Sequence, residues 1–174
     1  MYMQIYAWLA NRAFFDVRTT MPDLDIREIA QCTCLRLRRT TRRITQIYDR
    51  LLEPVGMTVN QFGLLARLYG ASLRRETLPI SVLAERVGMD PTTLNRSLKP
   101  LEAQGLITSA DDPADRRVRA VLITENGIAR LRQAIPQWRK AQAQIDQALG
   151  LDTTVALNGL LEVSYANLAK ARIL

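Results

Sequence analysis

The chain has 174 residues, a formal net charge of +7 and no histidine. This length fits one domain or two small lobes that share a core, and a pI of 10.0 favours an anionic partner such as nucleic acid. The absence of histidine excludes Ser-His-Asp and Cys-His catalytic sites and leaves only cysteines and carboxylates to bind zinc. We therefore predict a protein that is not an enzyme, with no catalytic residues, no metal and no cofactor.

Residues 1–25 are predicted to form an N-terminal extension. Its first residues are apolar but are interrupted by polar ones, too short to span a bilayer and a poor signal peptide. Because Met21 would make a natural alternative start, residues 1–20 are expected to be either a wrongly assigned start or a segment that packs on a partner subunit. The rest of the sequence has no transmembrane segment, and two cysteines fit a reducing cytosol. We expect a cytoplasmic protein with no membrane partner.

Helical periodicity dominates the first half of the chain. Apolar residues recur at helical intervals over residues 26–52, which predicts one long helix that ends before Pro54. The segment from Thr58 to Gln61 has the pattern of a capping box, in which the two side chains satisfy backbone amides at a helix start. This second helix is predicted to run to about Tyr69, with Gly70 separating it from the next element.

The C-terminal part is predicted to be two helices, one capped by Thr124 and ended by Gly150, the next capped by Asp152. Both carry apolar stripes, and the chain offers few other elements to cover them. Pairing of two subunits would solve this, although an ordinary intrachain bundle is the alternative. Residues 26–56 and 124–174 are therefore predicted to form a helical dimerisation region of a homodimer.

Residues 57–123 have the order of elements of a winged helix-turn-helix. A short helix is predicted from Ile80 to Val87, followed by a turn in which Gly88 can take a positive φ. Asp90 is placed to cap the next helix, and Pro91 occupies its first turn, where a missing N–H costs nothing. This arrangement would place the second helix in the major groove of DNA. The predicted fold class is thus mainly α with a small β-wing.

The predicted recognition helix has one apolar and one polar face. Leu94, Leu98 and Leu101 recur at helical spacing and are expected in the core. The opposite face can contact base edges or phosphates, with the lysine on phosphate. Its residues are Thr92, Thr93, Asn95, Arg96 and Lys99.

A charged hairpin follows, with strands predicted over Leu106–Ser109 and Val118–Ile123. An arginine at the tip of such a hairpin can enter the narrow, electronegative minor groove of DNA. Asp115 would oppose DNA if it were unpaired, so we expect it to orient an arginine. The positive edge of the hairpin consists of Arg116, Arg117 and Arg119.

Three motifs resemble the MarR family of bacterial transcription regulators. They are Leu83–Asp90, then Thr93–Glu102 with Gly105 and Leu106, and then Asp115–Arg117 leading to Leu122–Gly127. The resemblance implies a triangular homodimer with the terminal helices at its interface. It also implies binding to a palindromic operator in double-stranded DNA, usually as a repressor that an effector releases. By this resemblance Arg117 enters the minor groove and Asp115 orients it. The alternative is a non-specific or architectural DNA-binding protein.

The control of binding is predicted from the first helix. Cys34 and Tyr48 resemble a pair in the hydroperoxide-sensing branch of the family, although a second tyrosine of that branch would fall at Arg38. Cys32 would serve as a resolving thiol only with strain or across subunits. The alternatives are that both cysteines are small buried hydrophobes and that the effector is a small molecule. An arginine stripe over residues 36–43 is either a solvated face or the lining of an anion site.

Overall fold

The computed structural model describes residues 26–111 and 119–171. The predicted N-terminal extension and the wing tip, with Asp115, Arg116 and Arg117, lie outside the described residues. The chain divides into two compact units, Met1–Arg38 and Arg39–Leu174. The boundary falls inside a helix, and each unit is described by itself.

The described part of the first unit contains α2 (Ile26–Ala30) and the beginning of α3 (Thr33–Leu52). The prediction of one uninterrupted helix over residues 26–52 is therefore wrong. The break falls at Cys32, whose N–H donates to Ile29 O at 3.0 Å and whose carbonyl accepts from Arg36 N at 3.2 Å. Cysteine and threonine have poor helix propensity, so this stretch is a weak point that the apolar periodicity does not reveal.

The second unit begins with the rest of α3, a short 3-10 turn η1 (Glu53–Val55) and α4 (Val59–Leu73). The predicted capping box is confirmed: Gln61 N–H donates to Thr58 Oγ1 at 3.3 Å, and Thr58 N–H donates to Gln61 Oε1 at 2.9 Å. The predicted end near Tyr69 is wrong, because α4 continues through Gly70. The buried Ala71 extends the apolar stripe by another turn, so packing offsets the low helix propensity of glycine.

The next elements are β1 (Leu78–Pro79), α5 (Ile80–Val87), α6 (Pro91–Ala103), β2 (Ile107–Asp111) and β3 (Arg119–Ile123). The strands form a three-stranded antiparallel sheet in the order β1-β3-β2. The two predicted wing strands are present, and β1 is the strand that the sequence did not reveal. Two residues are too few for an alternating pattern, and they pair because β3 provides a partner.

The chain continues with α7 (Glu125–Leu149) and α8 (Leu151–Lys170). Thr124 caps α7 as predicted, accepting from Gly127 N at 3.1 Å. The predicted cap of the last helix is wrong, because Gly150 occupies that position and Asp152 lies in the first turn of α8. Within the described ranges, no helix is long and apolar enough to cross a membrane.

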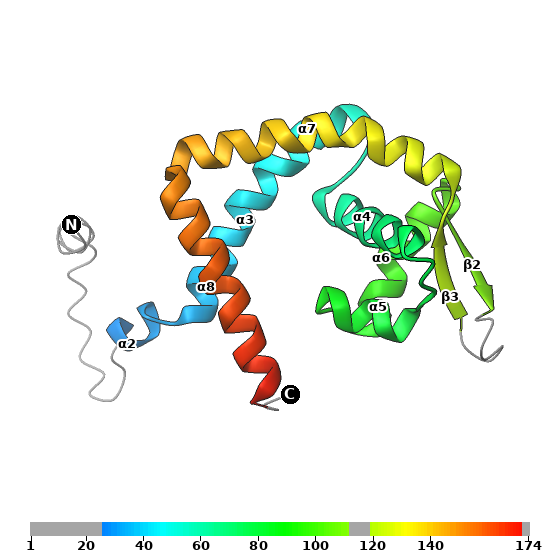
Figure 1. Ribbon diagram of the computed structural model, residues 1–174. Coiled ribbons are helices and arrows are strands. Elements are labelled where there is room, and N and C mark those ends of the chain that lie inside the picture. Colours follow the sequence, from blue (N-terminus) through cyan, green and yellow to red (C-terminus); the bar gives the residue numbers. More distant parts are fainter. Residues whose placement is uncertain (1–25, 112–118, 172–174) are drawn as a thin grey trace. The chain divides into compact units, whose positions relative to one another are not determined.

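The core lies where α4, α5, α6, the sheet and α7 meet, and Figure 1 shows these helices and strands gathered near the first turns of α7. In the described part of α8, by contrast, Thr154 is the one buried residue. The mainly α fold with a small β-wing is confirmed. The largest fully buried side chains are Leu52, Leu64, Leu65, Leu68, Leu78, Leu83, Leu94, Leu101 and Val121.

Candidate DNA-binding interface

The turn between α5 and α6 is built on a left-handed glycine. Gly88 has φ +65°, a conformation that costs a residue with a side chain more than it costs glycine. Its N–H donates to Glu85 O at 3.1 Å, and Met89 N–H donates to Ala84 O at 2.9 Å. These bonds close the end of α5 and direct the chain into α6, as the sequence predicted.

Asp90 caps α6 with both of its carboxylate oxygens. It accepts from Thr93 N at 2.9 Å and from Thr93 Oγ1 at 2.5 Å. Both bonds lower the pKa of Asp90, because they stabilise its charged form, and the bond from the Thr93 side chain has the larger effect. Since Thr93 donates its hydroxyl proton to Asp90, its oxygen can serve DNA only as an acceptor.

The outer face of α6 is polar and exposed in the described part of the chain. Leu94, Leu98 and Leu101 are buried beneath it, as predicted. Asn95, Arg96 and Lys99 are exposed. Their side chains make no hydrogen bond or ion pair with any other described residue. Amide, guanidinium and ammonium groups that are not paired within the protein keep their full capacity to bind bases or phosphates.

A hollow of about 410 Å³ separates α6 from the wing, and both elements contribute charge to it. Asn95 and Lys99 line it from α6, and Arg119 lines it from β3. The structure thus brings together three of the predicted contact residues. Two further polar residues of the lining, Glu102 and Ser109, were not predicted. Glu102 Oε1 accepts a hydrogen bond from Ser109 Oγ at 3.0 Å. The spacing of Glu102, three positions after Lys99, could have placed it on this face.

A close backbone crossing joins the wing to α7. A Cβ at Gly127 would lie 2.1 Å from Leu106 O and 2.7 Å from Ile123 Cγ1, distances that no side chain tolerates. Thr124 strengthens the crossing, because its N–H donates to Leu106 O at 3.1 Å and its hydroxyl donates to Gly105 O at 2.7 Å. The glycine in the Leu122–Gly127 pattern is therefore required by packing.

An exposed ion cluster links the end of α4 to α5. Glu76 accepts from Arg86 and from Arg74 Nη2, the latter at 3.0 Å. The hydrogen bonds from Arg86 and then Arg74 lower the pKa of Glu76 to about 2. The cluster occupies two arginines internally, so it is a structural support for α5 rather than a free basic surface.

The candidate redox residues have separate environments. Cys34 is exposed and Cys32 is half-buried. Tyr48 donates its hydroxyl proton to Gln142 Oε1 at 2.7 Å, and burial, followed by the charge of Asp146, raises the pKa of the Tyr48 hydroxyl. The hydroxyl proton of Tyr48 is thus donated to a side chain of α7. The pairing of Cys34 with Tyr48 stays a prediction.

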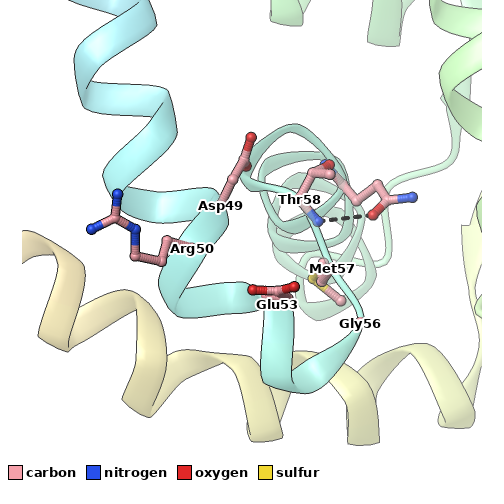
Figure 2. Close-up of a pocket in the computed structure, with 7 residues that line it drawn as sticks. Asp49, Arg50, Glu53, Gly56, Met57 and Thr58 are labelled. Carbon is pink, nitrogen blue, oxygen red and sulfur yellow. Dashed lines mark hydrogen bonds between the residues drawn. The ribbon is translucent and has the colours of Figure 1, made fainter.

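A second hollow, of about 400 Å³, lies between the end of α3 and the start of α4 (Figure 2). Asp49 and Glu53 line it together with Arg50, whose side chain points away from Thr58 in the figure. Asp49 Oδ1 already accepts from Val59 N at 2.8 Å, so a carboxylate of the chain occupies the helix start. This hollow does not suit an anion, and it contains none of the arginines of residues 36–43.

These features define a winged helix-turn-helix protein: a capped recognition helix with a free polar face, a hairpin beside it and a glycine turn before it. Comparison with known proteins agrees with this class. Residues 55–118 match the model of the MarR family. The chain is 33% identical over 94 residues to the organic hydroperoxide resistance transcriptional regulator of Bacillus subtilis, covering 54% of this chain and 61% of that protein.

A second relative is an uncharacterised HTH-type transcriptional regulator of B. subtilis, 29% identical over 60% of this chain and 65% of its own length. The matched segments thus span less than two thirds of both curated relatives. The structure of the Mycobacterium tuberculosis regulator MosR in complex with DNA is similar over 83% of this chain and all of that chain, with 34% identity and a TM-score of 0.69. The chain belongs to the MarR family.

Proposed function

We propose that this protein is a sequence-specific DNA-binding transcription regulator, a homodimer that represses transcription by binding a palindromic operator in the bacterial cytoplasm. The observation that carries the proposal is the outer face of α6, where Asn95, Arg96 and Lys99 are exposed and unpaired among the described residues. Three different donor groups on one helix face suit a groove edge and its phosphates. The DNA complex of the related MosR supports the same partner.

The homodimer is supported by the surface of α8. Soluble monomers seldom expose this many large apolar side chains on one helix. A second copy of the chain would cover part of this surface and would place two recognition helices on two half-sites, about one helical turn apart. The exposed apolar residues of α8 are Leu151, Val155, Leu160, Leu161, Val163, Tyr165 and Leu168.

The test is selection of operators from a random duplex library, followed by footprinting and titration at several salt concentrations. We expect a palindrome to be selected and protected. Lys99→Ala should weaken binding to all sequences and reduce the salt slope by about one, whereas Arg96→Ala should relax base preference. Protein that binds the random library as tightly as the selected palindrome would instead be a non-specific or architectural binder.

Arg117 and Asp115 are proposed to act at the wing tip, with Arg116 and Arg119 beside them. Arg117→Ala should weaken operator binding by at least ~1 kcal/mol, because an arginine in the minor groove is lost. Arg75→Ala is the matched control, since Arg75 is an exposed arginine in the turn after α4, outside the predicted interface. Equal affinity of both variants and the wild type would contradict the wing assignment.

Release of the operator is proposed to depend on an effector, either a small molecule or a hydroperoxide. The oxidative option is supported by the related B. subtilis regulator of organic hydroperoxide resistance and by the exposure of Cys34. Cys34→Ser should abolish hydroperoxide-induced release, while Cys32→Ser, two residues away, should retain the first oxidation step. Release that persists in Cys34→Ser would eliminate this thiol and leave the small-molecule option.

A further inference from the structure

One side chain of α8 reaches the turn of the helix-turn-helix. Tyr165 Oη donates to Glu85 O at 3.3 Å, across 80 residues of sequence. This hydrogen bond joins α8 to the lobe formed by α4, α5 and α6. The bond is long for an O–H···O contact, so the hydroxyl is a minor part of the link.

The ring of Tyr165 faces Gly88. A Cβ added at Gly88 would lie 3.5 Å from Tyr165 Oη and 3.6 Å from Tyr165 Cε2, which is ordinary van der Waals distance. The hydroxyl end of the ring therefore faces the glycine across a space that would admit a methyl group. Gly88 has a positive φ and closes the end of α5, so the residues that face the ring belong to a turn of restricted conformation.

The contact lies at the point where movement of the recognition helix would begin. The carbonyl of Glu85 is among the last of α5, where helical partners are missing, and it accepts both from Gly88 N–H and from Tyr165. Asp90, the cap of α6, follows two residues after Gly88. The hydrogen bond from Tyr165 thus connects α8 to the start of α6 through a short stretch of backbone.

We propose that Tyr165 is a positioning residue that couples the dimerisation helix to the helix-turn-helix and thereby sets the spacing of the two recognition helices. The proposal rests on the proposed function, because a spacing exists only in a dimer on a palindrome. Tyr165 does not touch DNA in this role; it restricts the angles at which α6 is held. The expected consequence is a strict preference for one separation of half-sites.

The experiment measures affinity for the selected palindrome, for duplexes with one or two base pairs added or removed between half-sites, and for a single half-site. Tyr165→Ala should reduce the preference for the selected spacing at least threefold and leave single half-site affinity unchanged. A general structural defect would lower both affinities. Tyr165→Phe should keep most of the preference, because the ring remains. Asn167→Ala, an exposed polar residue near the end of the same helix and outside the apolar surface of α8, should behave like the wild type.

A spacing preference in Tyr165→Ala equal to that of the wild type overturns the proposal. If the alanine variant does not fold, Tyr165→Leu replaces it, because leucine keeps apolar volume without the planar ring. A spacing preference in Tyr165→Leu equal to that of the wild type also overturns the proposal. Hydrogen exchange of the Gly88 and Met89 amides supplies a readout without DNA. Faster exchange of these amides in the substituted protein supports the coupling, and unchanged exchange overturns it. This readout holds even if the wild type selects no palindrome and the proposed function fails.

Discussion

The leucines of α6 are buried and most of those of α8 are exposed, although both helices are rich in apolar residues. In α6, Leu94 is 0% and Leu101 is 1% exposed, whereas in α8 Leu160 is 67% exposed. The winged helix-turn-helix completes its own core from α4, α5, α6, the sheet and α7. Helix α8 leaves most of its apolar side chains exposed, and in the proposed homodimer a second copy would cover them. One region is a folding unit, and we propose the other as half of an interface.

The largest expected effect tests the self-sufficient region. Gly127→Ala places a Cβ against Leu106 O, so the start of α7 or the wing must move. The free energy of unfolding should therefore fall by about 3 kcal/mol. Urea unfolding measures the change. Gly63→Ala is the matched control, a helical glycine with nothing within 4 Å of its added Cβ, and it should stabilise by up to ~1 kcal/mol. Equal free energies of unfolding for the two variants would refute the close approach of Gly127 to Leu106 O.

The next effect tests the interface. Leu160→Lys removes about 2 kcal/mol of apolar burial from each subunit, so the dimer dissociation constant should rise by at least ~100-fold. Sedimentation equilibrium over a concentration series measures it. Leu73→Lys, at 68% exposure in α4 against 67% for Leu160, carries the same substitution in the other region and should leave the dimer intact. A monomeric wild type, or dissociation in both variants, would break the comparison.

A smaller effect tests the start of α4, within the region that completes its own core. Thr58→Ala removes the acceptor of the capping box and should lower the free energy of unfolding by about 1 kcal/mol. Thr58→Ser keeps a hydroxyl in the same position and should retain most of that free energy. Thermal unfolding of the three proteins side by side distinguishes them, and an alanine variant as stable as the serine variant would show that the cap contributes little.

The smallest effect is a pH dependence at the ion cluster. The pKa of Glu76 is lowered to about 2 by Arg86 and Arg74, from an ordinary value of 4.5. A depressed pKa means that the stabilisation is complete above pH ~4.5 and is lost as the pH falls towards about 2. Glu76→Gln should remove this part of the acid dependence of the melting temperature. Parallel pH profiles for the wild type and Glu76→Gln would contradict the ion pair.

Local signals in the sequence predicted much of the fold. The Thr58 capping box, the Asp90 and Thr124 caps and the positive φ of Gly88 all depend on residues within a few positions of each other, and all are present. Predictions that depended on distant packing were less accurate. The end of α4 was placed too early because the burial of Ala71 is not a local property, and the two-residue strand β1 exists only through pairing with β3.

The candidate site divides in the same way. The polar outer face of α6 follows from the spacing of its buried leucines, so Asn95 and Lys99 could be predicted. Their approach to Arg119 around one hollow, with Glu102 bound to Ser109, required the packing of the wing on α6. The partner of Tyr48 was also unpredictable, since Gln142 lies 94 residues away on another helix.

By itself, the sequence determined the helix caps, the turn glycine, the apolar stripes and the basic charge, because each depends on near neighbours or on composition. Only the tertiary structure decided which stripes are buried within one chain and which remain exposed on α8. It also decided that Gly127 lies against Leu106 O and that Tyr165 reaches the carbonyl of Glu85. The physical reason is that burial and close packing are properties of surfaces brought together from distant segments, and chain-local propensities do not encode those distances.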